Sequence, residues 1–242
     1  MTNPDHLPVA AIIPAAGTGT RFPGETRKQF RLLAGRPLLV HTLERVWSAN
    51  VVSLVVVAVP EEDLDGIGEQ LLPLAPAGVE LLLVAGGAVR QASAAAGLEA
   101  LPPDIQVIVV HDAVRPLFEP RWIGETVALC RDFDGAIVAI PASDTLKEVE
   151  AVPTTSDKHS GTISHTIPRT SVWRAQTPQA FRADILRRAL RQAEDTGLAG
   201  TDEATLVEAV GGRIAVVEGS PGNIKVTTPE DWRYLEWRMQ ND

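Results

Sequence analysis

VAAIIPAAGTGTRF, residues 9–22, decides the fold class that the sequence predicts. Its first seven residues are all apolar, as in parallel strands that helices cover on both faces. The small residues and two glycines that follow let backbone N–H groups approach an anion closely. Ligands of open α/β sheets gather at the carboxyl ends of the strands, so we expect a ligand at this loop.

The rest of the chain repeats the alternation of apolar strands with amphipathic helices. Further apolar runs begin at residues 51, 79, 106, 135 and 213. Helices are expected over residues 37–48, 62–72, 90–101, 120–130 and 183–195, and two more begin near residues 201 and 228. This alternation predicts an α/β, Rossmann-like fold: a mostly parallel sheet with helices on both faces.

Residues 142–174 interrupt this alternation. They are mostly polar, contain Pro153 and Pro168, and hold only brief alternating runs such as TLKEVEAV and GTISHTI. A two-stranded hairpin is barely stable by itself in water. We therefore expect a protruding β-arm that a partner subunit completes, with a loose loop as the alternative. With no internal repeat, residues 1–242 are expected to form a single domain that carries this arm.

Composition and charge argue against several classes of protein. The net charge of −9 over 242 residues disfavours general nucleic-acid binding, which needs a basic face. The single cysteine, Cys130, rules out an intrachain disulfide and a cysteine-based zinc site. The sequence shows no signal peptide and no apolar run of about 18 residues. We therefore expect a cytoplasmic protein with no membrane or nucleic-acid partner.

Two well-known phosphate-binding motifs do not fit the loop after the first strand. A dinucleotide-binding fingerprint needs a third glycine where Phe22 stands. A P-loop needs a lysine after its last glycine, and Glu25 follows Gly24. Two cations just beyond the first glycines, Arg21 and Lys28, nevertheless favour a polyphosphate over a turn with no ligand. Charged hydrogen bonds to phosphate contribute about 1.5–3 kcal/mol each.

Small and polar residues also follow the later strands. GGAVRQAS, residues 86–93, is a second loop whose glycines let a ligand come close to the backbone, which suits a base or a ribose. HDAVRP, residues 111–116, ends a wholly apolar strand. We expect Asp112 and Arg115 to contact a metal–phosphate assembly or sugar hydroxyls, whereas His111 is expected to fill a gap in the packing.

These motifs stand in one order along nearly the whole chain, together with DTLK, HTIPR, QTPQAF, TDEA and NIKVT. In this order they resemble the 2-C-methyl-D-erythritol 4-phosphate cytidylyltransferases of the non-mevalonate isoprenoid pathway. The first loop by itself is similar to that of many sugar-nucleotide pyrophosphorylases, whereas HDA-x-RP, TPQ and NIKVT in series are far more specific. The resemblance implies that the acceptor 4-phosphate attacks the α-phosphate of CTP and that pyrophosphate is released.

The resemblance also implies roles for individual residues. The four expected catalytic residues are Arg21 and Lys28, which match the family's transition-state cations, and Arg169 and Lys225, which match the residues that position the acceptor phosphate. The residues that fall where the family holds CTP are Ala15, Ala16, Gly17, Thr18, Gly19, Gly87 and Ser93. The residues expected around the acceptor or the product are Asp112, Arg115, Thr145, Thr177 and Thr201.

Partners and cofactor follow from the same resemblance. In that family the arm is exchanged between subunits, which implies a homodimer in which Thr145 and Arg169 serve the partner's site. The sequence shows no dense carboxylate cage, so Mg²⁺ is expected to arrive mainly on the CTP phosphates. Ala88 stands where family members often carry an acid, which puts a side-chain contact to the base or ribose in question. Two alternatives stay open: a cytidylyltransferase for another polyol phosphate, such as ribitol 5-phosphate, and a non-catalytic nucleotide-binding protein.

Overall fold

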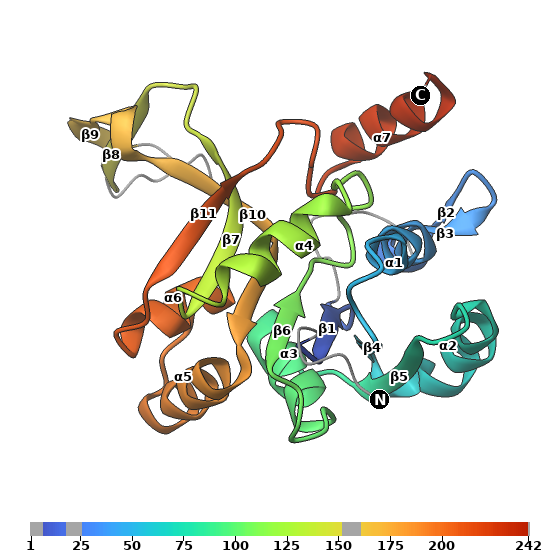
Figure 1. Cartoon of the computed structure of the whole chain (residues 1–242). Helices are drawn as coiled ribbons and strands as arrows, with labels where there is room; N and C mark the ends of the chain where they lie inside the picture. Colours follow the sequence, from blue (N-terminus) through green and yellow to red (C-terminus); the bar gives the residue numbers. More distant parts are fainter. Residues whose placement is uncertain (1–6, 18–25, 152–160, 242) are drawn as a thin grey trace.

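The computed structural model describes residues 7–17, 26–151 and 161–241, and a seven-stranded sheet lies at its centre (Figure 1). The strands lie in the order β11-β7-β10-β6-β1-β4-β5. Their bounds are β1 (Val9–Pro14), β4 (Leu54–Val59), β5 (Glu80–Ala85), β6 (Val107–Val110), β7 (Gly135–Pro141), β10 (Trp173–Arg182) and β11 (Ile214–Glu218). Only the two pairings made by β10 are antiparallel, which confirms the mostly parallel sheet.

Helices cover both faces of the sheet, because successive residues of a strand point to opposite sides. In β1, Ala11 and Ile13 belong to a core shared with α1, α2 and α4, whereas Ala10 and Ile12 belong to a core shared with α3, α5 and α6. The helix bounds are α1 (Leu38–Ser48), α2 (Leu64–Leu71), α3 (Arg90–Glu99), α4 (Arg121–Leu129), α5 (Ala183–Thr196) and α6 (Glu203–Ala209). Burial on both sides explains why the central strands β1, β4 and β6 are apolar throughout. In the described part of the chain, no helix has the length and apolar character needed to span a membrane.

The sequence analysis did not predict β10, the strand between β6 and β7. Its centre carries Gln176, Thr177 and Gln179, all buried polar residues, and its pairing with β7 shifts register between Ala175 and Gln179. A strand with a polar centre lacks the apolar run by which the other strands were recognised. β10 begins at Trp173, so the last two residues of the predicted arm belong to the sheet.

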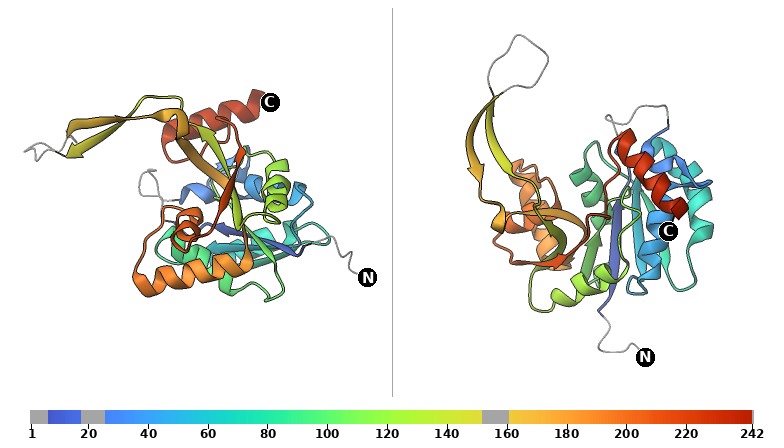
Figure 2. Two further views of the ribbon diagram at one scale, coloured as in Figure 1. Left: turned by 60° about the vertical axis from the view of Figure 1, so that its left-hand side comes forward. Right: turned by 90° about the horizontal axis from the view of Figure 1, so that it is seen from above.

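The predicted arm contains an antiparallel hairpin of β8 (Leu146–Ala151) and β9 (Gly161–Ile167), which projects away from the sheet (Figure 2). Residues 152–160, which connect the two strands, lie outside the described residues. Val149 and Ile163 are apolar and more than half exposed. The described part of this segment is therefore an extended hairpin rather than a loose loop, and it leaves apolar side chains uncovered.

The last helix, α7 (Pro229–Asn241), fixes the segment that carries Lys225. The backbone N–H of Asp231 donates to the Thr228 hydroxyl at 3.2 Å, so Thr228 caps the helix that the sequence predicts to begin near residue 228. Val226 is fully buried in a small third core that α7 covers. The remaining short elements are β2 (Leu32–Leu33), β3 (Arg36–Pro37) and the 3₁₀ turns η1 (Lys28–Phe30), η2 (Glu61–Asp63), η3 (Leu72–Leu74) and η4 (Arg169–Ser171).

Candidate active site

A cavity of about 520 Å³ opens at the carboxyl end of β1, the edge where the sequence predicts a ligand. It lies between the loop after β1, the turn η1, the loop before α3 and the residues that follow β6. The predicted site residues that line it are Ala15, Gly17, Lys28, Ser93, Asp112 and Lys225. Its size is that of a small-molecule site, and the combination of small residues with two lysines suits an anionic ligand.

Two glycines allow the loop before α3 to lie against the loop after β1. A Cβ atom on Gly86 would lie 2.5 Å from the Cβ atom of Ala16, and one on Gly87 would lie 2.4 Å from the Cβ atom of Ala92. The Ser93 hydroxyl donates to the Gly87 carbonyl at 3.3 Å. Neither glycine therefore tolerates a side chain without movement of this wall, which also orients Ser93.

Gln29 anchors the loop after β1 from below. Its side chain is buried, and its Nε2 donates to the carbonyl oxygens of Ala15 at 2.6 Å and Gly17 at 3.0 Å. Gln29 directly follows Lys28 in η1. These bonds hold η1, and with it the Lys28 backbone, at a fixed distance from the loop after β1.

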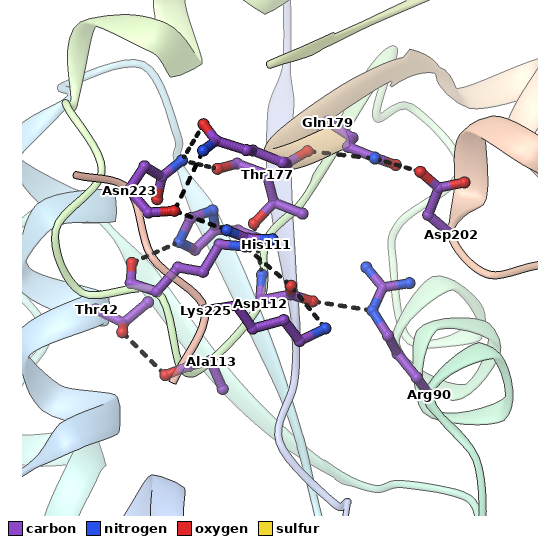
Figure 3. A network of polar contacts seen from close by, with 12 residues as sticks. Thr42, Arg90, His111, Asp112, Ala113, Thr177, Gln179, Asp202, Asn223 and Lys225 are labelled. Atoms are coloured by element: carbon purple, nitrogen blue, oxygen red, sulfur yellow. Dashed lines mark hydrogen bonds and ion pairs between the residues drawn. The ribbon is translucent and has the colours of Figure 1, made fainter. Parts of the chain in front are cut away.

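Asp112, which lies two residues beyond the end of β6, is the centre of a cluster of ion pairs (Figure 3). Its Oδ1 accepts a hydrogen bond from Arg90 Nε at 2.9 Å. Its Oδ2 accepts one from Arg115 Nε at 3.2 Å and pairs with Lys225 Nζ at 3.0 Å. Arg90 also reaches α6, where its Nη1 lies 2.8 Å from both carboxylate oxygens of Glu203. Because both carboxylates are buried, the surrounding cations must replace their lost hydration.

The ionisation of this Asp112 cluster favours a bound anion. Burial by itself would raise the pKa of Asp112, but Arg90, Lys225 and Arg115 hold it well below its usual range. Burial opposes the charge of Arg90, whose pKa is nevertheless raised by Glu203 and Asp112. Burial raises the pKa of Glu203 despite Arg90. Around Asp112 itself, Arg90, Arg115 and Lys225 are three cations that face one carboxylate beside the cavity.

His111 is a packed side chain, which agrees with the expectation that it fills a gap. It is fully buried, and its ring centroid lies 4.1 Å from that of Phe118. Its Nε2 lies 3.1 Å from the Arg115 carbonyl oxygen, so the Nε2–H tautomer donates there. Its Nδ1 has no partner among the described residues. Burial lowers the pKa of His111 to about 4, and the ring is neutral at physiological pH.

A second, smaller cavity of about 190 Å³ shares three residues with the first. Arg90, Asp112 and Lys225 line both cavities. The smaller cavity is also lined by Thr177 and Thr201, and the Thr177 hydroxyl accepts a hydrogen bond from the backbone N–H of Asp112 at 3.1 Å. The Asp112 cluster therefore separates two spaces that could hold two anionic ligands side by side.

Buried amides build the far wall of the smaller cavity (Figure 3). Asn223 Nδ2 donates to Gln176 Oε1 at 3.1 Å and to the Thr177 carbonyl at 2.9 Å. Gln179 Nε2 donates to Asp202 Oδ2 at 2.8 Å, which joins β10 to the start of α6. The sequence analysis assigned no individual role to Gln29, Gln176, Gln179, Asp202, Glu203 or Asn223. Five of them stand inside quoted motifs, but their burial and pairing depend on the unexpected strand β10 and on contacts distant in sequence.

Four predicted site residues in the described part of the chain line neither cavity: Ala16, Gly87, Thr145 and Arg169. Ala16 and Gly87 lie in the two loops that border the larger cavity. Thr145 and Arg169 are exposed and stand at the base of the hairpin, where Arg169 donates to the carbonyl of Ser143. Arg115 and Thr177 line only the smaller cavity, as does Thr201. The predicted site residues that lie outside the described part of the chain are Thr18, Gly19 and Arg21.

The donor set of the site suits a metal ion that binds mainly to a ligand. Within residues 7–17, 26–151 and 161–241, no group of three or more His, Cys, Asp or Glu side chains could hold a metal. Both oxygens of Asp112 already face cations. Magnesium often keeps only one or two protein carboxylates and takes substrate phosphate oxygens instead.

Three features of this α/β sheet define the nucleotidyltransferase class. They are a small-residue loop at the end of the first strand, a second glycine loop, and cations around one buried carboxylate. Comparison with known protein families then identifies the family within this class. The chain belongs to the family described as 2-C-methyl-D-erythritol 4-phosphate cytidylyltransferase, which matches residues 9–241.

Named relatives and solved structures agree with this family. A 2-C-methyl-D-erythritol 4-phosphate cytidylyltransferase of Acidobacterium capsulatum is 41% identical over 92% of this chain and 93% of its own length. One of Symbiobacterium thermophilum is 38% identical over 98% of this chain and 95% of its own length. The structure of 4-diphosphocytidyl-2C-methyl-D-erythritol synthase from Anaerococcus prevotii matches with a TM-score of 0.81 at 27% identity, covering 98% of this chain and 100% of that one. The cytidylyltransferase structure from Thermus thermophilus matches with a TM-score of 0.75 at 30% identity, covering 97% and 100%.

Proposed function

We propose that the two cavities hold CTP and 2-C-methyl-D-erythritol 4-phosphate on either side of the Asp112 cluster. The chain is a nucleotidyltransferase of isoprenoid precursor biosynthesis. It joins CTP and 2-C-methyl-D-erythritol 4-phosphate into 4-diphosphocytidyl-2-C-methyl-D-erythritol and pyrophosphate. The observation that carries the proposed arrangement is the set of three residues, Arg90, Asp112 and Lys225, that line both cavities.

The reaction needs alignment and charge neutralisation more than it needs a protein nucleophile. An oxygen of the acceptor phosphate attacks the α-phosphorus of CTP, and the bond from that phosphorus to the bridging oxygen breaks. Pyrophosphate leaves with the bonding electrons. Since the attacking group is already an anion, the enzyme contributes mainly by bringing two anions together in line and by stabilising the charge that develops.

The larger cavity is the proposed CTP site. Its glycine and alanine backbone gives close access to phosphates, and Lys28 also lines this cavity, where it would balance charge on the triphosphate. We assign the base and ribose to the side formed by Gly87 and Ser93. The proposed nucleotide-binding residues are Ala15, Ala16, Gly17, Thr18, Gly19, Gly87 and Ser93, with Arg21 and Lys28 as transition-state cations.

The smaller cavity is the proposed acceptor site. Lys225 reaches into both cavities, so its ammonium group is placed to hold the attacking phosphate beside the α-phosphate. Arg115 adds a second cation, and the hydroxyls of Thr177 and Thr201 are suited to the polyol chain. Asp112 keeps Lys225 in place through their 3.0 Å ion pair.

We assign Thr145 and Arg169 to the active site of a partner subunit. Both residues lie at the base of a projecting hairpin and away from the cavities of their own chain. The exposed apolar residues Val149 and Ile163 give the hairpin a surface that a second copy would cover. The proposed assembly is thus a homodimer with exchanged arms, each arm supplying an arginine for the acceptor phosphate.

Mg²⁺ is the proposed cofactor, held chiefly by the phosphates of CTP. When bound, it would neutralise part of the triphosphate charge and stabilise the leaving pyrophosphate. Among the described residues, the Asp112 and Glu203 carboxylates are already engaged by Arg90, Arg115 and Lys225, and Asp202 accepts from Gln179 and Thr205, which supports delivery of the metal with the nucleotide.

Subunit mixing tests the assignment of the arm. Lys28→Met and Arg169→Ala proteins, each inactive as a homodimer, would form mixed dimers in which one of the two sites keeps both side chains. With random exchange, half of the dimers are mixed, so about one quarter of the parent turnover should return. Mixing Lys28→Met with Lys225→Met is the matched control, because both changes affect the same side of the site and no intact site can form.

Recovery in the first mixture alone would support exchanged arms. Equal activity in both mixtures, after mass spectrometry has verified subunit exchange, would contradict the assignment of Arg169 to the partner's site.

A further inference from the structure

Arg90 and Glu203 form a buried chain of charges that connects α6 to the centre of the site. Glu203 lies at the start of α6, with its side chain 1% exposed, and both of its oxygens lie 2.8 Å from Arg90 Nη1. Arg90 lies at the start of α3, and its Nε donates to Asp112 Oδ1 at 2.9 Å. A single guanidinium group therefore holds two carboxylates that come from different parts of the chain.

Stabilisation of the fold does not explain why Arg90 and Glu203 form a buried ion pair. A buried ion pair is often no more stabilising than a well-packed apolar pair of the same volume, because both ions lose their hydration. What the pair provides is geometry. The planar guanidinium group presents its donors at fixed angles, so two carboxylates that bind it are held in a fixed relation.

The geometry of Arg90 determines how Asp112 faces Lys225. Because Arg90 occupies Oδ1, the other oxygen, Oδ2, is turned toward Lys225 Nζ at 3.0 Å and Arg115 Nε at 3.2 Å. Figure 3 shows Arg90 and Lys225 approaching the Asp112 carboxylate from different elements. Without Arg90 at Oδ1, the carboxylate would be held through Oδ2 alone and could turn about that contact, which would shift the partner that sets the position of Lys225.

We propose that Arg90, anchored by Glu203, is a positioning residue that fixes the Asp112 carboxylate and thereby holds the Lys225 ammonium group between the two cavities. Arg90 acts here through Asp112. The kinetic part of the inference depends on the proposed function, because it assumes that Lys225 contacts the acceptor phosphate. The structural part depends only on the ion pairs themselves.

Two single substitutions test the chain of contacts. Glu203→Gln keeps the shape of the side chain but removes the charge that anchors Arg90. Arg90→Lys keeps the charge but offers one donor group, which cannot serve both carboxylates in the same way. We expect each variant to lower kcat by about tenfold or more, because small displacements of aligned groups have large effects on rate. The KM for CTP should change by less than about threefold.

The control is Glu208→Gln, the same chemical change at an exposed position of the same helix α6. It should leave kcat unchanged. Since Glu203 is proposed to act through Arg90, adding Glu203→Gln to the Arg90→Lys protein should have little further effect on kcat. Independent, multiplicative losses in the double variant would overturn the proposed chain of contacts.

A variant with an apolar pair covers the case in which the single variants do not fold. Arg90→Met combined with Glu203→Leu removes both charges of this pair together, so Glu203 leaves no unpaired carboxylate, while Asp112 keeps Arg115 and Lys225 at Oδ2. We expect this protein to fold, to bind CTP and to show the low kcat of the single variants. A parent-like kcat in this folded protein would show that the pair is only structural, and a raised KM for CTP with unchanged kcat would show that Arg90 binds nucleotide directly.

Crystal structures of the parent and the apolar-pair variant test the positioning without any turnover. We expect the Asp112 carboxylate to rotate in the variant and Lys225 Nζ to leave hydrogen-bond distance. An unchanged Asp112–Lys225 pair would overturn the proposal. A parent that fails to turn over the two substrates would count against the proposed function alone, since the structural comparison is still decided by this pair.

Discussion

Asp112→Asn is the substitution that most directly probes the charge balance of the site. The change removes the negative charge that Arg90, Arg115 and Lys225 share, and it places amide hydrogens where donors now point. Removing one partner of a buried ion pair costs about 3–5 kcal/mol. Because the Lys225 side chain is 38% exposed and that of Arg90 is 25% exposed, water takes up part of the released charge. We therefore expect a loss at the lower end, about 3 kcal/mol.

Calorimetric unfolding measures this loss. For a chain of this size, 1 kcal/mol shifts Tm by about 2–4 °C, so Asp112→Asn should lower Tm by about 6–12 °C. CTP with Mg²⁺ should restore more of the Tm in the variant than in the parent, since the triphosphate replaces the missing negative charge. A variant that melts within about 2 °C of the parent would refute the view that Asp112 holds these cations together.

The pH dependence of the Tm difference between the parent and Asp112→Asn is a second test of the role of the Asp112 charge. The pKa of Asp112 is well below its usual range in the folded protein, because its attraction to Arg90, Lys225 and Arg115 outweighs the cost of burial. The carboxylate therefore contributes its full stability above the unfolded pKa of about 3.9, and this contribution is lost as pH falls below that value. The Tm difference between parent and variant should be constant from pH 7 to about pH 5 and should shrink below about pH 4. A difference that vanishes by pH 6 would contradict this origin.

Two further predictions concern the packing beneath the site and beside it. The folded pKa of His111 is about 4 because the ring is buried, and the unfolded pKa is about 6.5, so stability present above pH 6.5 should fall by up to about 3 kcal/mol as pH drops to 4. His111→Gln should remove this part of the pH dependence of the unfolding free energy, and equal slopes in parent and variant would contradict it. Gly86→Ala places a Cβ atom 2.5 Å from the Cβ atom of Ala16 and should raise the KM for CTP by about tenfold, or about 1.4 kcal/mol, by moving the wall of the cavity. Gly66→Ala, with no atom within 4 Å of the added Cβ atom, should leave the KM unchanged, and a parent-like KM for Gly86→Ala would show that the wall adapts.

The parts of the fold that the sequence predicted are those encoded by local patterns. Apolar runs are short-range signals, so β1, β4, β5, β6, β7 and β11 were all expected, as was a helix that begins near residue 201. The structure adds the N-cap of this helix, Asp202, whose Oδ1 accepts from the Thr205 N–H. β10 was not predicted, because Gln176, Thr177 and Gln179 give it a polar centre. Its burial comes from β6 and β7 on either side, and no local pattern reports those neighbours.

The candidate site likewise contains residues that local sequence patterns predicted and residues that only the structure reveals. Gly87, Lys28, Asp112 and Lys225 follow strands or stand in ordered motifs, and the structure brings them to one edge of the sheet. Glu203 stands in the motif TDEA, but the motif does not predict its burial, because an acid at the start of a helix is ordinarily a solvated first-turn residue. Only the three-dimensional arrangement shows it to be fully enclosed and paired with Arg90, 113 residues away.

Pyrophosphate release with CTP and Mg²⁺ tests the central claim most directly, with 2-C-methyl-D-erythritol 4-phosphate and ribitol 5-phosphate compared as acceptors. Membership of the 2-C-methyl-D-erythritol 4-phosphate cytidylyltransferase family predicts turnover with the methylerythritol phosphate and little or none with the ribitol phosphate. Faster turnover with ribitol 5-phosphate would assign the acceptor site to another polyol phosphate. Release of pyrophosphate with neither acceptor would contradict the account.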